Sequence, residues 1–369
     1  MKRDRPRLNL GLDRFSGLYI WALIIIVFSV WQPALFPTMA TVHSVASEQA
    51  ITGILALAVL IPLAAGAYDL SVGSTINLSC ILVTELMAND HWGMVPSIVV
   101  TLLVGVLIGA VNGLLVVRLH IDSFIATLGM ATIVAAVQTI VSGNNQPVPA
   151  EGTAWNNLTQ TSVFGFQIVF VYLIVIAVVL WWMLQRTPAG RYLFAIGGNR
   201  EAARLSGVKV SRYVWLSLIL SGGLSGLGGV LYASLLGPSL TFGQGMLLPA
   251  FAAVFLGSTQ IRPGRFNVWG TLLAVYVLAT GVKGLQLITG VQWLNDMFNG
   301  VALIGAVGFA VWRQRAAARR RLVGARAGDG TPSAPGGASP GPDNAGMLPG
   351  HQVSGQASSG AAQARAVQA

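Results

Sequence analysis

The chain has 369 residues, of which 54% are hydrophobic and only 9% are charged, whereas about a quarter of the residues of an average soluble domain are charged. With a mean hydropathy of +0.68, a soluble fold would have too little polar surface, so the lipid bilayer is the expected solvent. The net charge of +10 is split among short polar segments rather than gathered on a folded domain with a recognisable module, which argues against nucleic-acid binding.

Long apolar stretches without charges follow one another along the chain. A helix needs roughly 20 apolar residues to cross about 30 Å of hydrocarbon, and several runs reach this length while staying apolar on every face, which favours helices over alternating strands. We therefore predict an all-α, polytopic membrane helix bundle with about ten transmembrane helices. The ten predicted spans are Leu18–Pro37, Ala50–Gly66, Leu70–Met87, Val95–Val117, Phe124–Ser142, Phe166–Leu184, Tyr213–Leu236, Met246–Ser258, Phe266–Ile288 and Leu294–Trp312.

The basic residues test this span count, because the cytoplasmic segments of membrane proteins are enriched in Lys and Arg. If the N-terminus is cytoplasmic, every Lys and Arg except Lys283 falls on the cytoplasmic face. An incorrect count would scatter these charges over both faces, so the pattern predicts both termini inside (N-in, C-in). Residues 1–17 then form a basic cytoplasmic N-tail, residues 18–312 the transmembrane domain, and residues 313–369 a basic and then disordered cytoplasmic C-tail. These charges would also attract anionic membrane lipid.

Glycine marks where the helices are expected to turn and to approach closely. Residues 213–261 carry no charge and are too long for one helix, so the Gly237-Pro238 pair is the expected corner. Small residues also recur every four positions, a pattern that lets membrane helices pack closely; a moving hinge is the alternative. These small residues are Gly105, Gly109 and Gly113 in one span, and Gly222, Ser225, Gly226 and Gly229 in another.

Few polar residues interrupt the spans. The segment GAYDLSVGS places Asp69 and Ser71 where the second apolar span gives way to the third. Either side chain could cap the start of the third helix; the alternative is a direct role in a path through the membrane or in its gate. Asn77, Asn144 and Gln244 are further candidates for such a path, although polar side chains in membrane helices more often hold helices together.

Other ionisable residues suggest structural roles. Glu85, Lys283 and Asp296 are expected towards the outer side, where Lys283 and Asp296 would pair. The four histidines are far apart and lack metal-ligand spacing, and the single cysteine, Cys80, lies in an apolar segment as a packing residue. We therefore expect no metal site and no catalytic set of side chains.

One polar stretch between spans, residues 186–212, reads RTPAGRYLFAIGGNREAARLSGVKVSR. It contains six basic residues and Glu201, yet its apolar residues are spaced as in short amphipathic helices. A simple connector would not need an apolar face. The stretch therefore predicts a cytoplasmic docking surface for a partner protein, with helices that lie on lipid headgroups as the alternative.

Four motifs, in this order, resemble those of the ribose-type ABC sugar permease family. They are GAYDLSVGS, VNGLLVVRLHIDSFIATLGM, RTPAGRYLFAIGGNREAARLSGVKVSR and LPAFAAVFLGSTQIRPGRFNVWGTLLAVYVLATGVKGLQL. The match runs from about Gly53 to Gly308. The chain departs from the family at GAYDLS, where GGIDLS is commoner, and at LLPAFAAVFLGS, where many members have an acidic residue before the Ala pair.

The resemblance implies that residues 18–312 are a permease domain of the bacterial inner membrane, and that residues 186–212 couple it to a separate ATPase subunit. This chain lacks a G-x-x-x-x-G-K-[ST] loop, so ATP and Mg would be used by that partner; the chain itself would bind no cofactor and would not be an enzyme. A periplasmic or lipid-anchored sugar-binding protein and a second permease subunit, identical or paralogous, are the other implied partners. The residues implied for coupling are Gly190, Arg191, Gly197, Asn199, Glu201, Ala202, Ala203 and Gly207, of which Glu201, Ala202, Ala203 and Gly207 match the E-A-A-x-x-x-G pattern.

Two other classes of transporter remain as alternatives. The first is a permease of the same superfamily for branched-chain amino acids or nucleosides, which would differ in the binding protein that it accepts. The second is an ion-coupled secondary transporter, which needs no ATPase and usually has a membrane-embedded ion site. The coupling loop argues against the second alternative.

Overall fold

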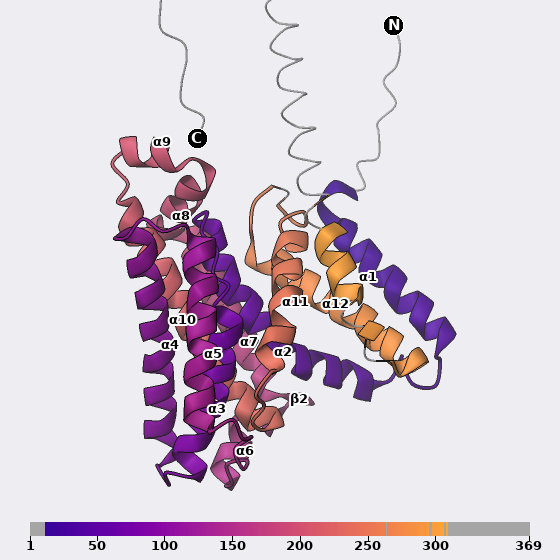
Figure 1. Ribbon diagram of the computed structural model, residues 1–369. Helices are drawn as coiled ribbons and strands as arrows, with labels where there is room; N and C mark the ends of the chain where they lie inside the picture. Colours follow the sequence, from indigo (N-terminus) through magenta and orange to yellow (C-terminus); the bar gives the residue numbers. More distant parts are fainter. Residues whose placement is uncertain (1–11, 263, 292, 295–296, 306–307, 309–369) are drawn as a thin grey trace, which may run out of the picture. The chain divides into compact units, whose positions relative to one another are not determined.

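A computed structural model describes residues 12–262, 264–291, 293–294, 297–305 and 308, with side chains from Gly17 onwards. Helices account for almost all of this part of the chain (Figure 1). The helices are α1 (Leu12–Trp31), α2 (Met39–Ala64), α3 (Val72–Ala88), α4 (Met94–Val117), α5 (Ser123–Ser142), α6 (Thr153–Gln160), α7 (Ile168–Arg186), α8 (Pro188–Gly198), α9 (Arg200–Leu205), α10 (Val210–Leu236), α11 (Phe242–Gly257) and α12 (Val268–Thr289). Residues 297–305 are also helical.

The long helices match the predicted spans. Six of them, α2, α4, α5, α7, α10 and α12, are long and apolar enough to cross a membrane, and three shorter apolar helices comprise Gly17–Trp31, α3 and α11. Together they correspond to the first nine predicted spans. The tenth, Leu294–Trp312, is helical where it is described, and its remainder lies outside the described residues, as do most of the N-tail and the whole C-tail. The prediction of an all-α, polytopic membrane bundle is therefore confirmed.

Three local features depart from the prediction. Helix α2 begins at Met39 rather than at Ala50, because the Thr38 side chain accepts a hydrogen bond from the Thr41 amide (3.2 Å) and no breaker follows until Gly53. Between α5 and α7 lie the short helix α6 and a two-residue hairpin of β1 (Ser162–Val163) and β2 (Phe166–Gln167). The helix α6 and strand β1 are too short and too polar to resemble apolar spans, whereas β2 occupies the first two residues of the predicted span Phe166–Leu184.

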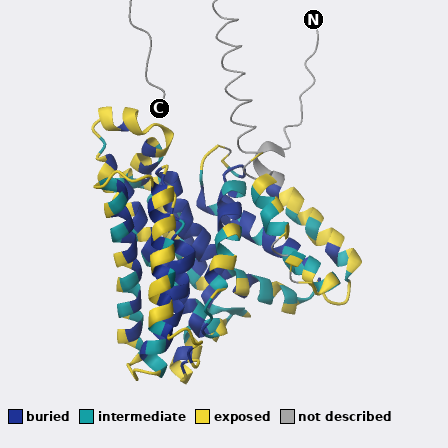
Figure 2. Ribbon diagram, viewed as in Figure 1, coloured by how far each residue is buried: buried dark blue, intermediate teal, exposed yellow. Residues whose placement is uncertain are grey.

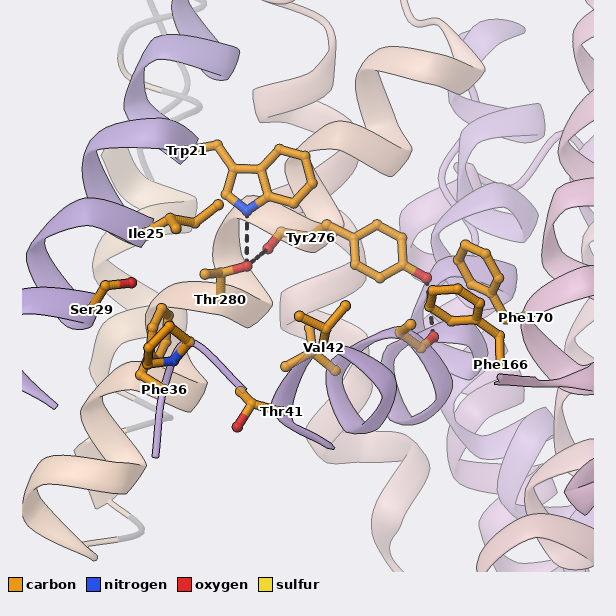
Figure 3. A pocket seen from close by; sticks show the side chains of 13 residues that line it. Trp21, Ile25, Ser29, Phe36, Thr41, Val42, Phe166, Phe170, Tyr276 and Thr280 are labelled. Atoms are coloured by element: carbon orange, nitrogen blue, oxygen red, sulfur yellow. Dashed lines mark hydrogen bonds between the residues drawn. The ribbon is translucent and has the colours of Figure 1, made fainter. Parts of the chain in front are cut away.

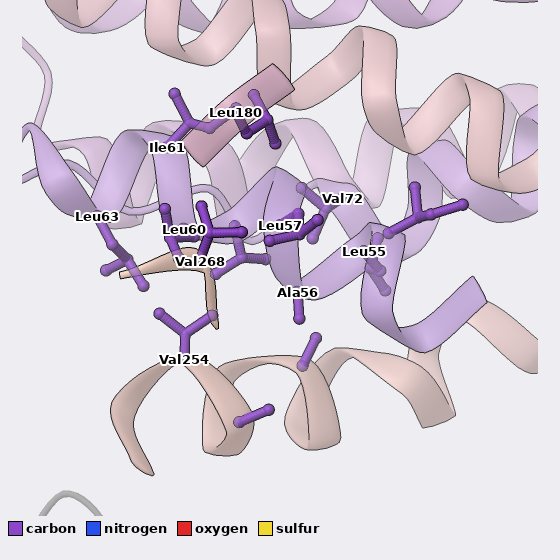
Figure 4. Packing of buried hydrophobic residues seen from close by; sticks show 14 of the residues in the cluster. Leu55, Ala56, Leu57, Leu60, Ile61, Leu63, Val72, Leu180, Val254 and Val268 are labelled. Atoms are coloured by element: carbon purple, nitrogen blue, oxygen red, sulfur yellow. The ribbon is translucent and has the colours of Figure 1, made fainter. Parts of the chain in front are cut away.

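The core of the bundle is built around α2 and α3. Helix α2 is buried without interruption from Ala50 to Ala64, and most of α3 is buried as well. In Figure 4, Leu57 and Leu60 of α2 lie among side chains of α7, α11 and α12. By contrast, α4, α5 and α7 expose many apolar side chains (Figure 2), as expected of helices that face lipid. Helix α3 has only 17 residues and is enclosed by other helices. An enclosed helix does not face lipid, so its length need not match the thickness of the hydrocarbon core.

Glycine allows α4 and α10 to approach backbone to backbone. A Cβ atom built at Gly105 would lie 2.7 Å from the carbonyl oxygen of Gly222 and 3.1 Å from the Cα of Gly226. A Cβ at Gly109 would overlap the carbonyl oxygen of Leu218. The predicted close packing is thus confirmed. In lipid, such packing replaces the hydrophobic effect as the force between helices.

The corner between α10 and α11 lies at the predicted Gly-Pro pair. Helix α10 ends at Leu236, and Gly237 has a φ of 86°, a left-handed conformation that glycine adopts without steric cost. The chain then returns as α11, which contains Pro249 within its length.

Candidate functional site

The predicted amphipathic loop, residues 186–212, forms helices α8 and α9. Helix α8 begins with a proline at its first position and buries Gly190, Leu193 and Ile196. A new helix starts at once because the Asn199 side chain accepts a hydrogen bond from the Ala202 amide (2.9 Å). Arg191 is exposed. The loop is therefore an ordered pair of helices with one buried face.

The E-A-A-x-x-x-G pattern has a structural basis in α9. Ala203 is buried, and Gly207 takes a φ of 80° directly after the helix. The Val208 amide then donates to the Ala203 carbonyl (3.1 Å) and the Gly207 amide to the Arg204 carbonyl (3.0 Å), which is a Schellman motif. Gly207 thus ends α9, while Glu201 faces solvent.

Helix α8 rests directly on the end of α2. A Cβ at Gly197 would overlap the carbonyl oxygen of Ala64, and one built at Gly66 would lie 3.3 Å from the Cα of Gly197. The Arg265 guanidinium lies 3.7 Å from the centroid of the Phe194 ring, so the connection between α11 and α12 is also attached to α8. A displacement of α8 would therefore reach α2 and the segment that follows it.

That segment carries a buried polar cluster. Asp69 is fully buried, and its Oδ1 accepts hydrogen bonds from the amide (3.1 Å) and the hydroxyl (2.7 Å) of Ser71. Asn112 of α4 donates to the Ser71 hydroxyl (2.8 Å). Ser123 and Thr127 of α5 accept hydrogen bonds from backbone amides of the same segment. The cluster joins α3, α4 and α5 just beyond the end of α2.

The predicted capping role of this segment is wrong. Ser71 is the N-cap residue of α3, but its side chain accepts no hydrogen bond from the first turn. Asp69 binds Ser71 itself instead of a helical amide. The Ser71 hydroxyl is instead engaged by Asp69 and by Asn112 of α4, which lies 41 residues later in the chain and was not singled out in the sequence.

Burial raises the pKa of the Asp69 carboxyl above its usual range, and the nearby hydroxyls of Ser71 and Ser221 oppose this shift only in part. Its Oδ2 and the Oδ1 of Asn112 accept no hydrogen bond within the described part of the chain. The cluster therefore leaves two buried acceptors without a partner in the described residues, which costs stability.

Asn77, in the first half of α3, ties helices together at a different place. Its side chain donates to the Leu240 carbonyl (3.0 Å) and accepts from the Gly243 amide (2.7 Å). Gln138 of α5 donates to the same Leu240 carbonyl (2.9 Å). All of these contacts fix the corner between α10 and α11, so Asn77 holds helices together.

The predicted path residues do not form one site. Asp69 and Ser71 touch, whereas Asn77 lies six residues further along the chain and binds the corner between α10 and α11. Asn144 is exposed after α5 with a φ of 60°, and Gln244 is exposed on α11. Asn112 and Thr127 were not singled out in the sequence. Each lies on the buried face of its helix together with other polar residues, so its residue type alone gave no signal.

Lys283 has a partner other than the expected one. Its Nζ lies 3.6 Å from Glu48 Oε2 and donates to the Ser44 hydroxyl (3.1 Å), and Ser44 in turn donates to Glu48 Oε1 (2.6 Å). Asp296 lies outside the described residues. The first part of α2, which was not predicted as helix, provides this partner.

A largely apolar pocket of about 320 Å³ lies among α1, α2, α7 and α12 (Figure 3). The indole of Trp21 donates to Thr280 (2.9 Å), and the Tyr276 hydroxyl donates to the Ala46 carbonyl (3.2 Å). Because these polar groups already have partners, the pocket offers little to a hydrophilic solute.

The fold defines a multi-pass membrane protein with a pair of short helices, α8 and α9, outside its spans. Residues 41–307 match the model of a family described as branched-chain amino acid transport system, permease component. The chain therefore belongs to this permease family, whose members are subunits of transporters of the bacterial inner membrane and are not enzymes.

Curated relatives cover most of the chain. It is 31% identical to the ribose import permease protein of Bacillus subtilis over 80% of this chain and 91% of that protein. It is 32% identical to the fructose import permease protein of Rhizobium meliloti over 82% of this chain and 86% of that protein. It is also 31% identical to the autoinducer 2 import system permease protein LsrD of Yersinia enterocolitica over 68% of this chain and 78% of that protein. No solved structure matches the chain significantly.

Proposed function

We propose that the chain is the membrane-spanning permease subunit of an ABC importer for a simple sugar, a pentose or hexose such as ribose. The observation that carries this proposal is the 31% identity to a ribose import permease over 91% of that relative's length. The similarity to a fructose import permease supports the same class of substrate. About ten spans with both termini in the cytoplasm complete the proposed arrangement.

Helices α8 and α9 are the proposed docking site for a separate ATPase that uses ATP and Mg. Leu205 of α9 is 81% exposed, so this helix presents a large apolar side chain that a docked partner would cover. Glu201 lies exposed on the same short helix. Closure of the ATPase would move α8 against α2 and bias the bundle between its inward-open and outward-open packings. A sugar-binding protein and a second permease subunit are the remaining proposed partners.

Autoinducer 2 is a second candidate substrate because one relative imports it, and the description of the family gives branched-chain amino acids as a third. Uptake of labelled pentoses, hexoses, autoinducer 2 and leucine should be compared in cells with and without this gene. We expect deletion to abolish uptake of one sugar. Loss of autoinducer 2 or leucine uptake alone would replace the proposed substrate.

The ABC mechanism has its own test. The protein should co-purify with an ATPase from native membranes, and Glu201→Lys should reduce both co-purification and uptake, because it reverses a charge on the proposed docking helix. If no ATPase co-purifies and Glu201→Lys leaves uptake unchanged, the chain is not an ABC permease.

A further inference from the structure

A second cavity, of about 230 Å³, lies among α2, α11 and α12 and has a different character from the apolar pocket. Gln49 and Thr52 of α2 line it, together with Gln286 of α12 and Asn299 of the helical residues 297–305. Three carboxamides and a hydroxyl thus meet at one cavity inside a membrane bundle. The described lining residues include no charged side chain.

The side-chain amides of this cavity do not hold helices together. Gln49, Gln286 and Asn299 make no side-chain hydrogen bond within the described part of the chain, in contrast to Asn77 and Gln138, whose amides bind backbone groups. Gln49 and Gln286 lie near Glu48 and Lys283, towards the proposed outer face, and an amide without a protein partner there faces water or a ligand. The amides are therefore available to a solute in the cavity.

Helix α11 adds a backbone acceptor to the cavity. Pro249 lacks an N–H group and cannot donate the helical hydrogen bond to the carbonyl of Gly245, and both residues line the cavity. A Cβ built at Gly245 would meet no atom within 4 Å, so this side of α11 borders open space. Broken helical hydrogen bonds at a cavity are a common feature of solute sites in transporters.

The chemistry of the lining selects a class of solute. Carboxamides, a hydroxyl and a carbonyl can both donate to and accept from sugar hydroxyls. An amino acid would bring a carboxylate and an ammonium group, for which the described lining offers no counter-charge. In the ion pair found in the described part of the chain, Lys283 and Glu48 bind each other and the Ser44 hydroxyl.

We infer that this cavity, with Gln49, Thr52, Gly245, Gln286 and Asn299, binds a neutral, polyhydroxylated solute such as a monosaccharide within one permease subunit. The inference rests on the proposed function and names the place where the sugar is held during its passage. It assigns the exposed end of α12, through Gln286, a role in solute selection.

Filling the cavity tests this inference. Gly245→Leu would place a side chain in the cavity without a backbone clash, and Gly129→Leu on the exposed face of α5 is the matched control, since a Cβ there also meets nothing within 4 Å. In cells that express the complete importer, Gly245→Leu should abolish uptake of the labelled sugar. Stimulation of ATP hydrolysis by the sugar-loaded binding protein should persist in the purified complex, and Gly129→Leu should behave as wild type.

A second variant covers the case in which Gly245→Leu lowers the thermal stability of the complex. Gln286→Leu removes one amide and should raise the KM for sugar uptake roughly tenfold, the cost of one lost hydrogen bond, with an unchanged midpoint of thermal unfolding. A merely structural Gln286 would lower that midpoint instead. If both variants take up the sugar as the wild type does, this inference alone is overturned. If the wild type imports no monosaccharide, the proposed function is overturned.

Discussion

At the scale of single residues, glycine determines how closely α4 and α10 can approach. Replacement of a helical glycine by alanine usually stabilises a helix, because alanine loses less backbone entropy on folding. The gain disappears where the new methyl group would overlap a neighbouring backbone. The same substitution should therefore have opposite effects at different positions of this bundle.

We predict that Gly109→Ala destabilises the protein and that Gly129→Ala does not. A Cβ at Gly109 would overlap the Leu218 carbonyl, and such overpacking costs about 1–3 kcal/mol, whereas a Cβ at Gly129 meets nothing within 4 Å. Thermal unfolding of the detergent-purified variants measures both effects. If Gly109→Ala unfolds at the same temperature as Gly129→Ala, or above it, the packing of α4 on α10 is not as described.

Asp69 gives the protein a predicted dependence of stability on pH. Burial raises the pKa of its carboxyl in the folded protein, so the folded state binds the proton more tightly than the unfolded state does. The resulting stabilisation is fully present below the unfolded pKa of about 3.9 and is lost as the pH rises through the folded pKa. Asp69→Asn should abolish this loss and be more stable than the wild type at neutral pH.

The control for Asp69→Asn is Asp122→Asn. Asp122 is exposed, and its side chain accepts a hydrogen bond from the Phe124 amide at the start of α5 (2.9 Å), a role that asparagine can also fill. Thermal unfolding between acid and alkaline pH should therefore follow the wild-type profile for Asp122→Asn only. A wild-type profile for Asp69→Asn would show that this carboxyl does not carry the predicted dependence.

At the scale of elements, hydropathy located the spans but not the contacts between them. The positions of α4, α5 and α10 follow from the length and polarity of single stretches, which are local properties. The partner of Lys283 and the neighbours of Asp69 are brought together by packing between helices distant in sequence. A search for charge-free stretches also excluded the start of α2, because His43 and Glu48 lie there.

For the candidate site too, the local helices could be predicted from the sequence, whereas the contacts between distant segments could not. The loop was predicted to form short amphipathic helices, without their number or bounds. The role of Gly207 became clear only from its left-handed φ of 80°. The contact of Gly197 with the end of α2 could not be predicted, because both partners are small, ordinary residues in the sequence. Gln49 and Gln286 were overlooked for a similar reason, since an amide carries no sign of whether it has a partner.

Helix α8 should transmit motion through that contact. We predict that Gly197→Ala weakens coupling, because a methyl group there would push α8 away from Ala64, whereas a Cβ at the neighbouring Gly198 meets nothing within 4 Å. Coupling free energies are typically 1–3 kcal/mol, so stimulation of ATP hydrolysis by the loaded binding protein should fall about fivefold or more. Gly198→Ala serves as the control. Equal stimulation in the two variants would exclude this contact as the coupling route.

At the scale of the whole molecule, the described contacts agree with the proposed orientation. Lys283, the one basic residue assigned to the outer face, lies near the end of α12 and contacts Glu48 near the start of α2. In the proposed topology α2 begins, and α12 ends, at that face. The hairpin of β1 and β2 belongs to the same face, and α8 and α9 belong to the opposite one, because only α7 lies between them.

Cysteine labelling tests this topology across α7. Cys80 is the single cysteine and is buried, so a Cys80→Ser background should be silent to a membrane-impermeant maleimide. In that background Phe164→Cys, at a side chain that is 98% exposed, should react in intact spheroplasts. Leu205→Cys, at a side chain that is 81% exposed, should react only after permeabilisation. The reverse pattern would place the ATPase-docking helices outside the cell, and reaction of both from one side would mean that α7 does not span the membrane; either result excludes the proposed coupling mechanism.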